Sequence, residues 1–366
     1  MKRIRVLHVV GAMNMGGIEN FVMNLFRASD RENFQFDFLY ITTQKCYFDD
    51  EIERLGGRIF RITGRNSNLK KHNQELHAFF LENQDIACVH IHASNAFCYN
   101  DAKIAKKCGI KQVFVHSHTS SAPHKILHYL ARTRLPIYVD EYLACSDLAA
   151  QWMFPSYVQK KALLIPNGIF LSKYLYSEEI ANQIRDKYGL HGKLVIGHVG
   201  RMEPVKNHAF LINTLVQIKK TQPDTVLFLI GNGSLRSELE KKVEQHHLQD
   251  SVIFAGIQKN VNEYLQAFDA MVFPSLFEGL PVTLIEAQAA GVPCYISDTI
   301  TKDVAVTELA NYLPLSIGAQ GWAEYILKDL RRYPHHPDCS NQIREAGFDI
   351  RITAAMLESL YRGKQE

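Results

Sequence analysis

The chain has 366 residues and a mass of 41.8 kDa, more than a single hydrophobic core usually holds, so we expect two domains. Its composition, 46% hydrophobic and 22% charged, is that of an ordinary globular protein and excludes a disordered or fibrous chain. The net charge of +3 gives no reason to expect a nucleic-acid partner. None of the seven cysteines shows Cys-x-x-Cys spacing, which argues against a disulfide framework or a zinc knuckle and favours the cytoplasm.

Short β-branched runs alternate with stretches of helical period, and this alternation occurs twice. In the first series we expect strands at 4–10, 36–41, 58–62, 88–92, 112–116, 142–145 and 162–165, with helices such as 19–27 and 73–82 between them. In the second series we expect strands at 194–199, 226–230, 252–255, 270–273 and 294–296, with helices near 210–220, 235–246 and 283–290.

This order predicts an α/β protein with two doubly wound, Rossmann-like domains. The N-terminal domain should cover residues 1–170 and the C-terminal domain residues 190–344, with a polar, strand-free linker between Pro166 and His191. Because open α/β sheets bind ligands beyond the carboxyl ends of their strands, we expect the site in a cleft between the domains.

Two glycine-rich turns each follow a predicted strand. The first contains Gly16-Gly17 and opens a helix, which suits either a phosphate or a simple tight turn. The second contains Gly231-Asn232-Gly233, and Ser234 is the expected N-cap of the helix that follows. The third glycine of a dinucleotide fingerprint would fall on Arg236, which disfavours a nicotinamide cofactor.

Four charged residues carry the strongest chemical signal. Arg201 and Lys206 follow a strand and could clamp a diphosphate, since a planar guanidinium and a mobile ammonium both stabilise developing negative charge. Glu278 follows another strand, and Glu286 lies eight residues later in an otherwise apolar helix. Carboxylates in such places can accept hydrogen bonds from sugar hydroxyls. Taken singly, each pair also fits ordinary surface charge or helix capping.

At these residues the chain resembles the family-four retaining glycosyltransferases of the GT-B fold, which include bacterial exopolysaccharide and capsule enzymes. The resemblance covers nearly the whole chain. It rests on Glu278 with Glu286, on Gly200-Arg201 with Lys206-Asn207, and on the opening Gly16-Gly17-Ile18-Glu19.

The resemblance implies roles for these residues. Arg201 and Lys206 would hold the donor diphosphate, Glu278 would contact the transferred sugar, and Glu286 would contact the nucleotide ribose. The remaining donor-binding positions would be Gly17, Gly231, Asn232, Gly279 and Leu280, with the loop from Ile257 to Val261 bordering the base. The family also places a histidine after an N-domain strand. His116 and His118 both qualify, and we favour His118 as catalytic because it lies nearer the strand's carboxyl end.

The resemblance further implies front-face transfer from a UDP-sugar, in which the leaving diphosphate accepts the acceptor's proton. We expect no cofactor and no metal, because the sequence lacks an Asp-x-Asp element and the two cations would supply the charge. A C-terminal helix within 345–366 should return to the N-terminal domain.

The acceptor should be a glycan or a lipid-linked sugar. A cationic, aromatic stretch at 124–135 predicts either peripheral contact with the inner face of the cell membrane or an ordinary solvated helix face. Two alternatives to a transferase remain. One is a non-hydrolysing sugar-nucleotide 2-epimerase of the same architecture, and the other is a non-catalytic binding subunit that keeps the fold.

Overall fold

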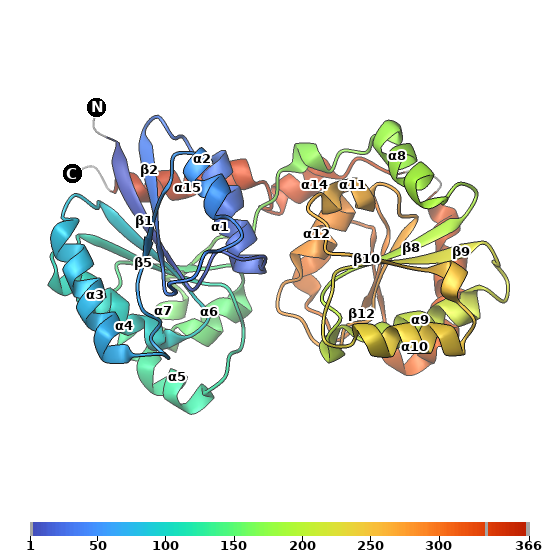
Figure 1. The fold of residues 1–366 in the computed structure, drawn as a ribbon, viewed down its shortest axis with the longest axis horizontal. Coiled ribbons are helices and arrows are strands. Elements are labelled where there is room, and N and C mark those ends of the chain that lie inside the picture. Colours follow the sequence, from blue (N-terminus) through green and yellow to red (C-terminus); the bar gives the residue numbers. More distant parts are fainter. Residues whose placement is uncertain (1–2, 334–335, 364–366) are drawn as a thin grey trace. The chain divides into compact units, whose positions relative to one another are not determined.

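A computed structural model describes residues 3–333 and 336–363 of the chain. The chain forms two compact units, which divide between Ile169 and Phe170 and again between Ala346 and Gly347 (Figure 1). Unit 1 therefore contains both ends of the chain, and unit 2 is the continuous segment between them.

Unit 1 is a seven-stranded parallel sheet with helices on both faces (Figure 1). Its strand order is β3-β2-β1-β4-β5-β6-β7. The strands are β1 (Ile4–Val10), β2 (Phe34–Tyr40), β3 (Arg58–Arg61), β4 (Cys88–Ala93), β5 (Gln112–Ser117), β6 (Glu141–Ala144) and β7 (Leu163–Leu164). The helices are α1 (Gly17–Ala28), α2 (Asp49–Arg54), α3 (Leu69–Glu82), α4 (Tyr99–Lys107), α5 (Lys125–Arg132), α6 (Asp147–Met153), α7 (Ser156–Gln159) and α15 (Ile350–Arg362).

Unit 2 repeats the same winding with a six-stranded parallel sheet of order β10-β9-β8-β11-β12-β13. Its strands are β8 (Leu194–Val199), β9 (Thr225–Ile230), β10 (Val252–Gly256), β11 (Ala270–Phe273), β12 (Cys294–Ser297) and β13 (Ala310–Leu313). Its helices are α8 (Glu178–Tyr188), α9 (His208–Ile218), α10 (Arg236–Gln245), α11 (Val261–Leu265), α12 (Val282–Ala289), α13 (Gly318–Asp329) and α14 (Ser340–Glu345). The prediction of two doubly wound α/β domains is confirmed.

Unit 2 contains elements that were not expected, among them β13, α8, α11 and α13. The edge strand β13 mixes polar and apolar residues, and their order does not distinguish it from a loop. Helix α8 lies inside the stretch expected to be a linker, although its caps are visible in the sequence. The Ser177 side chain accepts a hydrogen bond from the backbone N–H of Ile180, and Gly189 ends the helix in the left-handed conformation.

The C-terminal helix lies in unit 1. Helix α15 packs against α1 and β1, so the last and the first parts of the chain lie side by side (Figure 1). Gly168 permits the close approach, because a Cβ there would stand 2.7 Å from the Cα of Ile350. The hydroxyl of Tyr361 lies 2.7 Å from Nδ1 of His90 in the core. The last three residues of the expected segment, 364–366, lie outside the described residues.

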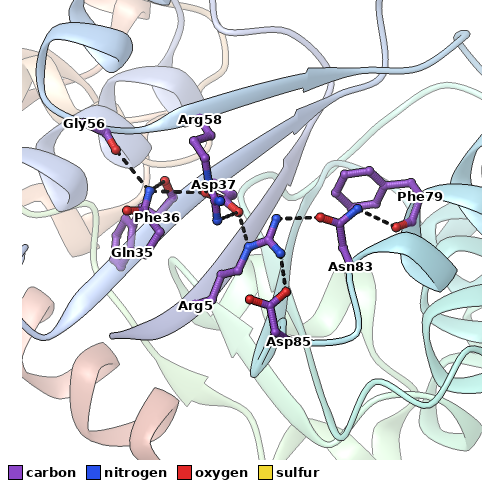
Figure 2. A network of polar contacts seen from close by, with 9 residues as sticks. All are labelled: Arg5, Gln35, Phe36, Asp37, Gly56, Arg58, Phe79, Asn83 and Asp85. Carbon is purple, nitrogen blue, oxygen red and sulfur yellow. Dashed lines mark hydrogen bonds and ion pairs between the residues drawn. The ribbon is translucent and has the colours of Figure 1, made fainter. Parts of the chain in front are cut away.

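A buried ionic network joins the amino-terminal parts of β1, β2 and β3, away from the carboxyl ends where ligands bind (Figure 2). The Asp37 carboxylate accepts hydrogen bonds from Nε of Arg5 at 2.5 Å and from Nε of Arg58 at 2.8 Å. Arg5 also donates to Asp85 and Asn83. Every oxygen of the fully buried Asp37 carboxylate is therefore paired with a guanidinium.

We expect Asp37→Ala to lower the free energy of unfolding by about 3–5 kcal/mol, because it leaves the buried Arg5 guanidinium without its main counter-charge. Asp50→Ala is the matched control. Asp50 pairs with Lys45 on the surface, where the two side chains are 79% and 71% exposed, so we expect a loss below about 1 kcal/mol. Urea denaturation of both variants measures the difference. Equal losses would show that the network does not stabilise unit 1.

Candidate active site

The switch point of unit 2 lies between strands β8 and β11, which are neighbours in the sheet but lead to helices on opposite faces. The loop after β8 carries Arg201 and Lys206, and the loop after β11 carries Glu278. Two hydrogen bonds join these loops: the N–H of Leu276 donates to the Val205 carbonyl at 2.8 Å, and the Asn207 side chain donates to the Pro274 carbonyl at 3.2 Å. The fold therefore brings these motifs, about seventy residues apart in sequence, to one edge of the sheet.

Lys206 and Glu278 form an ion pair at this edge. Nζ of Lys206 lies 2.7 Å from Oε1 of Glu278, and the two side chains are only 17% and 16% exposed. The ammonium also lies 4.9 Å from the ring centroid of Phe273, the last residue of β11. A partly desolvated ammonium held this way is a fixed positive charge beside a carboxylate, an arrangement suited to an anionic, hydroxyl-rich ligand.

The guanidinium of Arg201 is exposed, and it makes no hydrogen bond or ion pair with the part of the chain that the structure describes. Nearby, the backbone N–H groups of Gly279 and Leu280 precede helix α12 and donate to no described residue. Free N–H groups at a helix N-terminus attract negative charge. The loops after β8 and β11 therefore present one paired cation, one unpaired cation and two free donors.

Glycines allow the loop after β9 to pack against the loop after β8. Gly231 has a φ of +131°, and a Cβ there would stand 2.1 Å from the Gly200 carbonyl oxygen. A Cβ on Gly233 would stand 2.5 Å from the Met202 carbonyl oxygen. Asn232 accepts a hydrogen bond at its backbone carbonyl from the N–H of Met202. Gly231 and Asn232 thus lie directly beside the Arg201 loop.

We expect Gly231→Ala to destabilise unit 2 by more than the about 1–3 kcal/mol of a strained backbone conformation, because the new methyl group also collides with the Gly200 carbonyl. Gly192→Ala separates the two effects. Gly192 has a φ of +74° but open space around its Cα, so only the conformational cost applies. Thermal unfolding of both variants provides the comparison, and equal melting temperatures would contradict the close packing.

Glu286 lies on α12, and Tyr174 donates its hydroxyl to Oε1 of this glutamate at 2.7 Å. Burial raises the pKa of Glu286, and the hydrogen bond from Tyr174 opposes that shift. Sequence reasoning missed Tyr174, because it lies 112 residues earlier and belongs to no motif. In the loop after the edge strand β10, Ile257 is 63% exposed, and Val261 begins α11.

The expected capping role of Ser234 is wrong. Helix α10 begins at Arg236, and no side chain caps it. The Ser234 hydroxyl instead donates to Oε2 of Glu203 at 2.9 Å, which joins the loops after β9 and β8. The Ser234 hydroxyl therefore bonds to the distant Glu203 carboxylate and does not cap the helix that follows it.

Gly17 and His118 lie in unit 1, at the carboxyl ends of β1 and β5. The turn before α1 already holds a carboxylate, because a Cβ on Gly16 would stand 2.2 Å from Oε2 of Glu19. Burial raises the pKa of Glu19. A phosphate at Gly17 would have to displace this side chain.

Of the two candidate histidines, His116 is fully buried on β5, whereas His118 lies just beyond the strand and is partly exposed. His118 does not stand alone. Its Nε2 lies 2.9 Å from Nδ1 of His92, whose Nε2 lies 3.0 Å from Nδ1 of His8.

Sequence reasoning missed His8 and His92. The available signal was histidine at alternate positions of two strands, 90 with 92 and 116 with 118, which predicts one shared face.

Comparison with known proteins identifies the family. Residues 181–345 match the family described as "Glycosyl transferases group 1". The glycosyltransferase assigned as EpsF in Bacillus subtilis (strain 168) is 34% identical over 373 residues, covering 98% of this chain and 96% of the relative. The chain belongs to this family of glycosyltransferases. A second relative, the capsular polysaccharide biosynthesis glycosyltransferase CapH of Staphylococcus aureus, is 25% identical and covers 99% of both chains.

Solved structures confirm the predicted GT-B fold. Anabaena Alr3699/HepE in complex with UDP-glucose has a TM-score of 0.79 and 16% identity, and the match covers 98% of this chain and 100% of that one. The lipopolysaccharide outer core galactosyltransferase WaaB has a TM-score of 0.69 and 17% identity, with 98% and 99% covered. Within residues 3–333 and 336–363, no helix combines the length and apolar character needed to cross a membrane.

Proposed function

We propose that this glycosyltransferase moves a sugar from a UDP-sugar to a glycan or lipid-linked sugar, with retention of anomeric configuration, in exopolysaccharide or capsule synthesis. The observation that best supports this proposal is the Lys206–Glu278 ion pair at the sheet edge that also carries the unpaired Arg201. The relatives named for capsular polysaccharide synthesis and the neighbours bound to UDP and UDP-glucose support this donor and pathway class.

In this proposal unit 2 binds the donor and unit 1 binds the acceptor. Arg201, Lys206 and the free N–H groups of Gly279 and Leu280 stabilise the diphosphate as it leaves, so the donor requires no metal. Glu278 accepts a hydrogen bond from the sugar, Glu286 from the ribose, and the 257–261 loop borders the base. His118 of unit 1 contacts the transferred sugar.

The proposed chemistry is front-face transfer. A double displacement would need a carboxylate nucleophile close to the anomeric carbon. Glu278 is instead engaged by Lys206 at 2.7 Å, which favours a binding role over a nucleophilic one. The acceptor hydroxyl then attacks the anomeric carbon as the bond to the diphosphate breaks, and the diphosphate oxygen accepts the hydroxyl proton.

The test is a transfer assay in EDTA with a panel of nucleoside-diphosphate sugars and undecaprenol-linked saccharides, followed by NMR of the product's anomeric carbon. We expect donor-dependent product with retained configuration. Glu278→Gln should bind UDP at least as tightly as wild type, because it removes a negative charge near the diphosphate, yet turn over far more slowly. An inverted product, or dependence on a divalent ion, would contradict the proposal.

The same assay separates the two alternatives. Conversion of a UDP-sugar to its epimer without an acceptor would identify a 2-epimerase. Nucleotide binding without transfer to any acceptor in the panel would favour a binding subunit.

Helix α5 provides a surface for the proposed lipid-linked acceptor. Its apolar side chains project outward, with Ile126 79%, Leu130 65% and Leu127 57% exposed. The basic residues Lys125 and Arg132 lie on the same helix. Exposed apolar side chains beside cations fit an anionic membrane surface, and we propose that this helix rests on one.

Sedimentation with phosphatidylglycerol vesicles tests this contact. We expect Ile126→Glu with Leu130→Glu to abolish co-sedimentation. Leu81→Glu, at an exposed leucine of α3, is the control and should bind as wild type. Equal binding by both variants would exclude α5 as the membrane contact.

A further inference from the structure

Three histidine rings converge at the carboxyl ends of β4 and β5 in unit 1. The parallel register pairs His92 with His116, and His118 follows two residues later on the same face. One ring nitrogen from each of His92, His116 and His118 lies within 4.8 Å of the others. The rings of His116 and His118 stack with centroids 4.0 Å apart.

We propose that His92, His116 and His118 bind one divalent transition-metal ion such as Zn²⁺. Neutral imidazole is a preferred ligand of zinc, cobalt and nickel. Nitrogens bound tetrahedrally at about 2.0–2.1 Å from a metal stand about 3.4 Å from one another, so small rotations of these rings would suffice. Nothing in the donor chemistry proposed for unit 2 uses this site.

The surroundings of the three rings match the outer partners that metal-bound histidines need. A ligating imidazole usually donates its other N–H to a nearby acceptor. His92 can donate from Nε2 to Nδ1 of His8, 3.0 Å away. Asn167 is a hydrogen-bonding neighbour of His118, and its buried Oδ1 could accept the N–H of the buried Nδ1 of that ring.

His116 shows the same pattern. Both of its ring nitrogens are buried, and the backbone of Ile165 is close enough to hydrogen-bond to one of them, whereas no side chain within the described ranges does so. Buried, unpaired ring nitrogens are costly. A metal bound to one nitrogen of His116 would satisfy a ring that has no side-chain partner among the described residues, and it would replace the 2.9 Å contact between Nδ1 of His92 and Nε2 of His118.

Of the three proposed ligands, His92 lines a cavity of about 230 Å³ together with Glu19 and Arg65, and His118 is itself partly exposed. Three protein ligands leave a fourth position open, as in zinc sites that hold water or an anion. The carboxylate of Glu19 provides negative charge on the wall of the cavity.

Metal binding would have a consequence for transfer, and this consequence rests on the proposed function. Ligation through Nε2, with Nδ1–H facing Asn167, uses both nitrogens of His118. That histidine could then no longer contact the transferred sugar, so the metal-loaded enzyme should be inhibited.

The experiment titrates untagged, EDTA-stripped protein with Zn²⁺ by calorimetry and with Co²⁺ by visible absorption. We expect one ion per chain, the intense bands of tetrahedral Co²⁺, and loss of that site in His116→Gln. His8→Gln, which removes only an outer partner, should weaken binding by about 10- to 100-fold. His77→Gln, at an exposed histidine of α3, should bind as wild type.

X-ray absorption of zinc-loaded wild type needs no variant and should show three imidazole ligands. Absence of one-to-one binding, or a zinc shell without three imidazoles, would overturn the metal site. These measurements use no donor or acceptor, so their outcome is independent of the proposed function. Metal binding without inhibition of transfer would leave the site intact and remove His118 from the proposed sugar contact.

Discussion

Lys206→Ala should lower the rate of sugar transfer by about 10²- to 10³-fold, the usual effect of removing one preorganised group that stabilises developing charge. The ammonium is held between Glu278 and Phe273 and is only 17% exposed, so water cannot easily replace it. Arg201→Ala should act in the same direction. The measurement is the single-turnover rate at saturating donor.

Two control variants separate the effect of losing the Lys206 charge from an effect on folding stability. Lys241→Ala removes an exposed lysine of α10 in the same unit and should leave the rate unchanged. The double variant Lys206→Ala with Glu278→Ala removes both partners of the ion pair and should restore any melting temperature lost in Lys206→Ala. A folded Lys206→Ala protein with a rate within threefold of wild type would contradict the assigned role.

As the pH is lowered, the free energy of unfolding should begin to fall at a pH well above the range in which carboxylates titrate. Burial lowers the pKa of His8 and His118 to about 3 and that of His208 to about 4. Burial also holds the pKa values of four further histidines well below 6.5, namely His90, His92, His116 and His198. The folded protein keeps these rings neutral, whereas the unfolded chain protonates them below about pH 6.5.

Above pH 6.5 each such histidine is neutral in both the folded and the unfolded chain. As the pH falls from 6.5 toward the folded pKa, only the unfolded chain takes up the proton. Each histidine therefore lowers the free energy of unfolding by up to about 1.4 kcal/mol per pH unit. Between pH 7.5 and 5.5 we therefore expect a loss of several kcal/mol. Glu19, Glu286 and Glu358 oppose part of this loss, because burial raises their pKa values.

Differential scanning calorimetry in EDTA at pH 7.5, 6.5 and 5.5 measures the effect without bound metal. His208→Leu should flatten the pH dependence, since neither ring nitrogen of His208 has a hydrogen-bond partner in the described part of the chain. A melting temperature that is the same at pH 7.5 and 5.5 would show that these rings are not kept neutral by burial.

The sequence predicted the fold well, because buried parallel strands such as β9 are continuous apolar runs that end at glycine turns. It also predicted that Arg201, Lys206 and Glu278 follow strands, and the strand order then places them at one switch point. The order of the strands in the sheet cannot be read from any local sequence pattern.

Contacts between distant segments could not be predicted in the same way. Tyr174 meets Glu286, and His8 meets His92, only because the sheets and their covering segments bring these side chains together. The Ser234 error has the same origin, since local capping rules omit a partner 31 residues away.

We propose that unit 2 binds the diphosphate of a nucleotide sugar through Arg201 and Lys206, without a metal. The most direct test is calorimetric titration of the EDTA-treated protein with UDP, beside Arg201→Ala at matched concentration. We predict one UDP per chain, and binding at least tenfold weaker in the variant. Failure of every nucleoside diphosphate to bind wild type, or equal affinity in Arg201→Ala, would contradict binding of the diphosphate by these two cations.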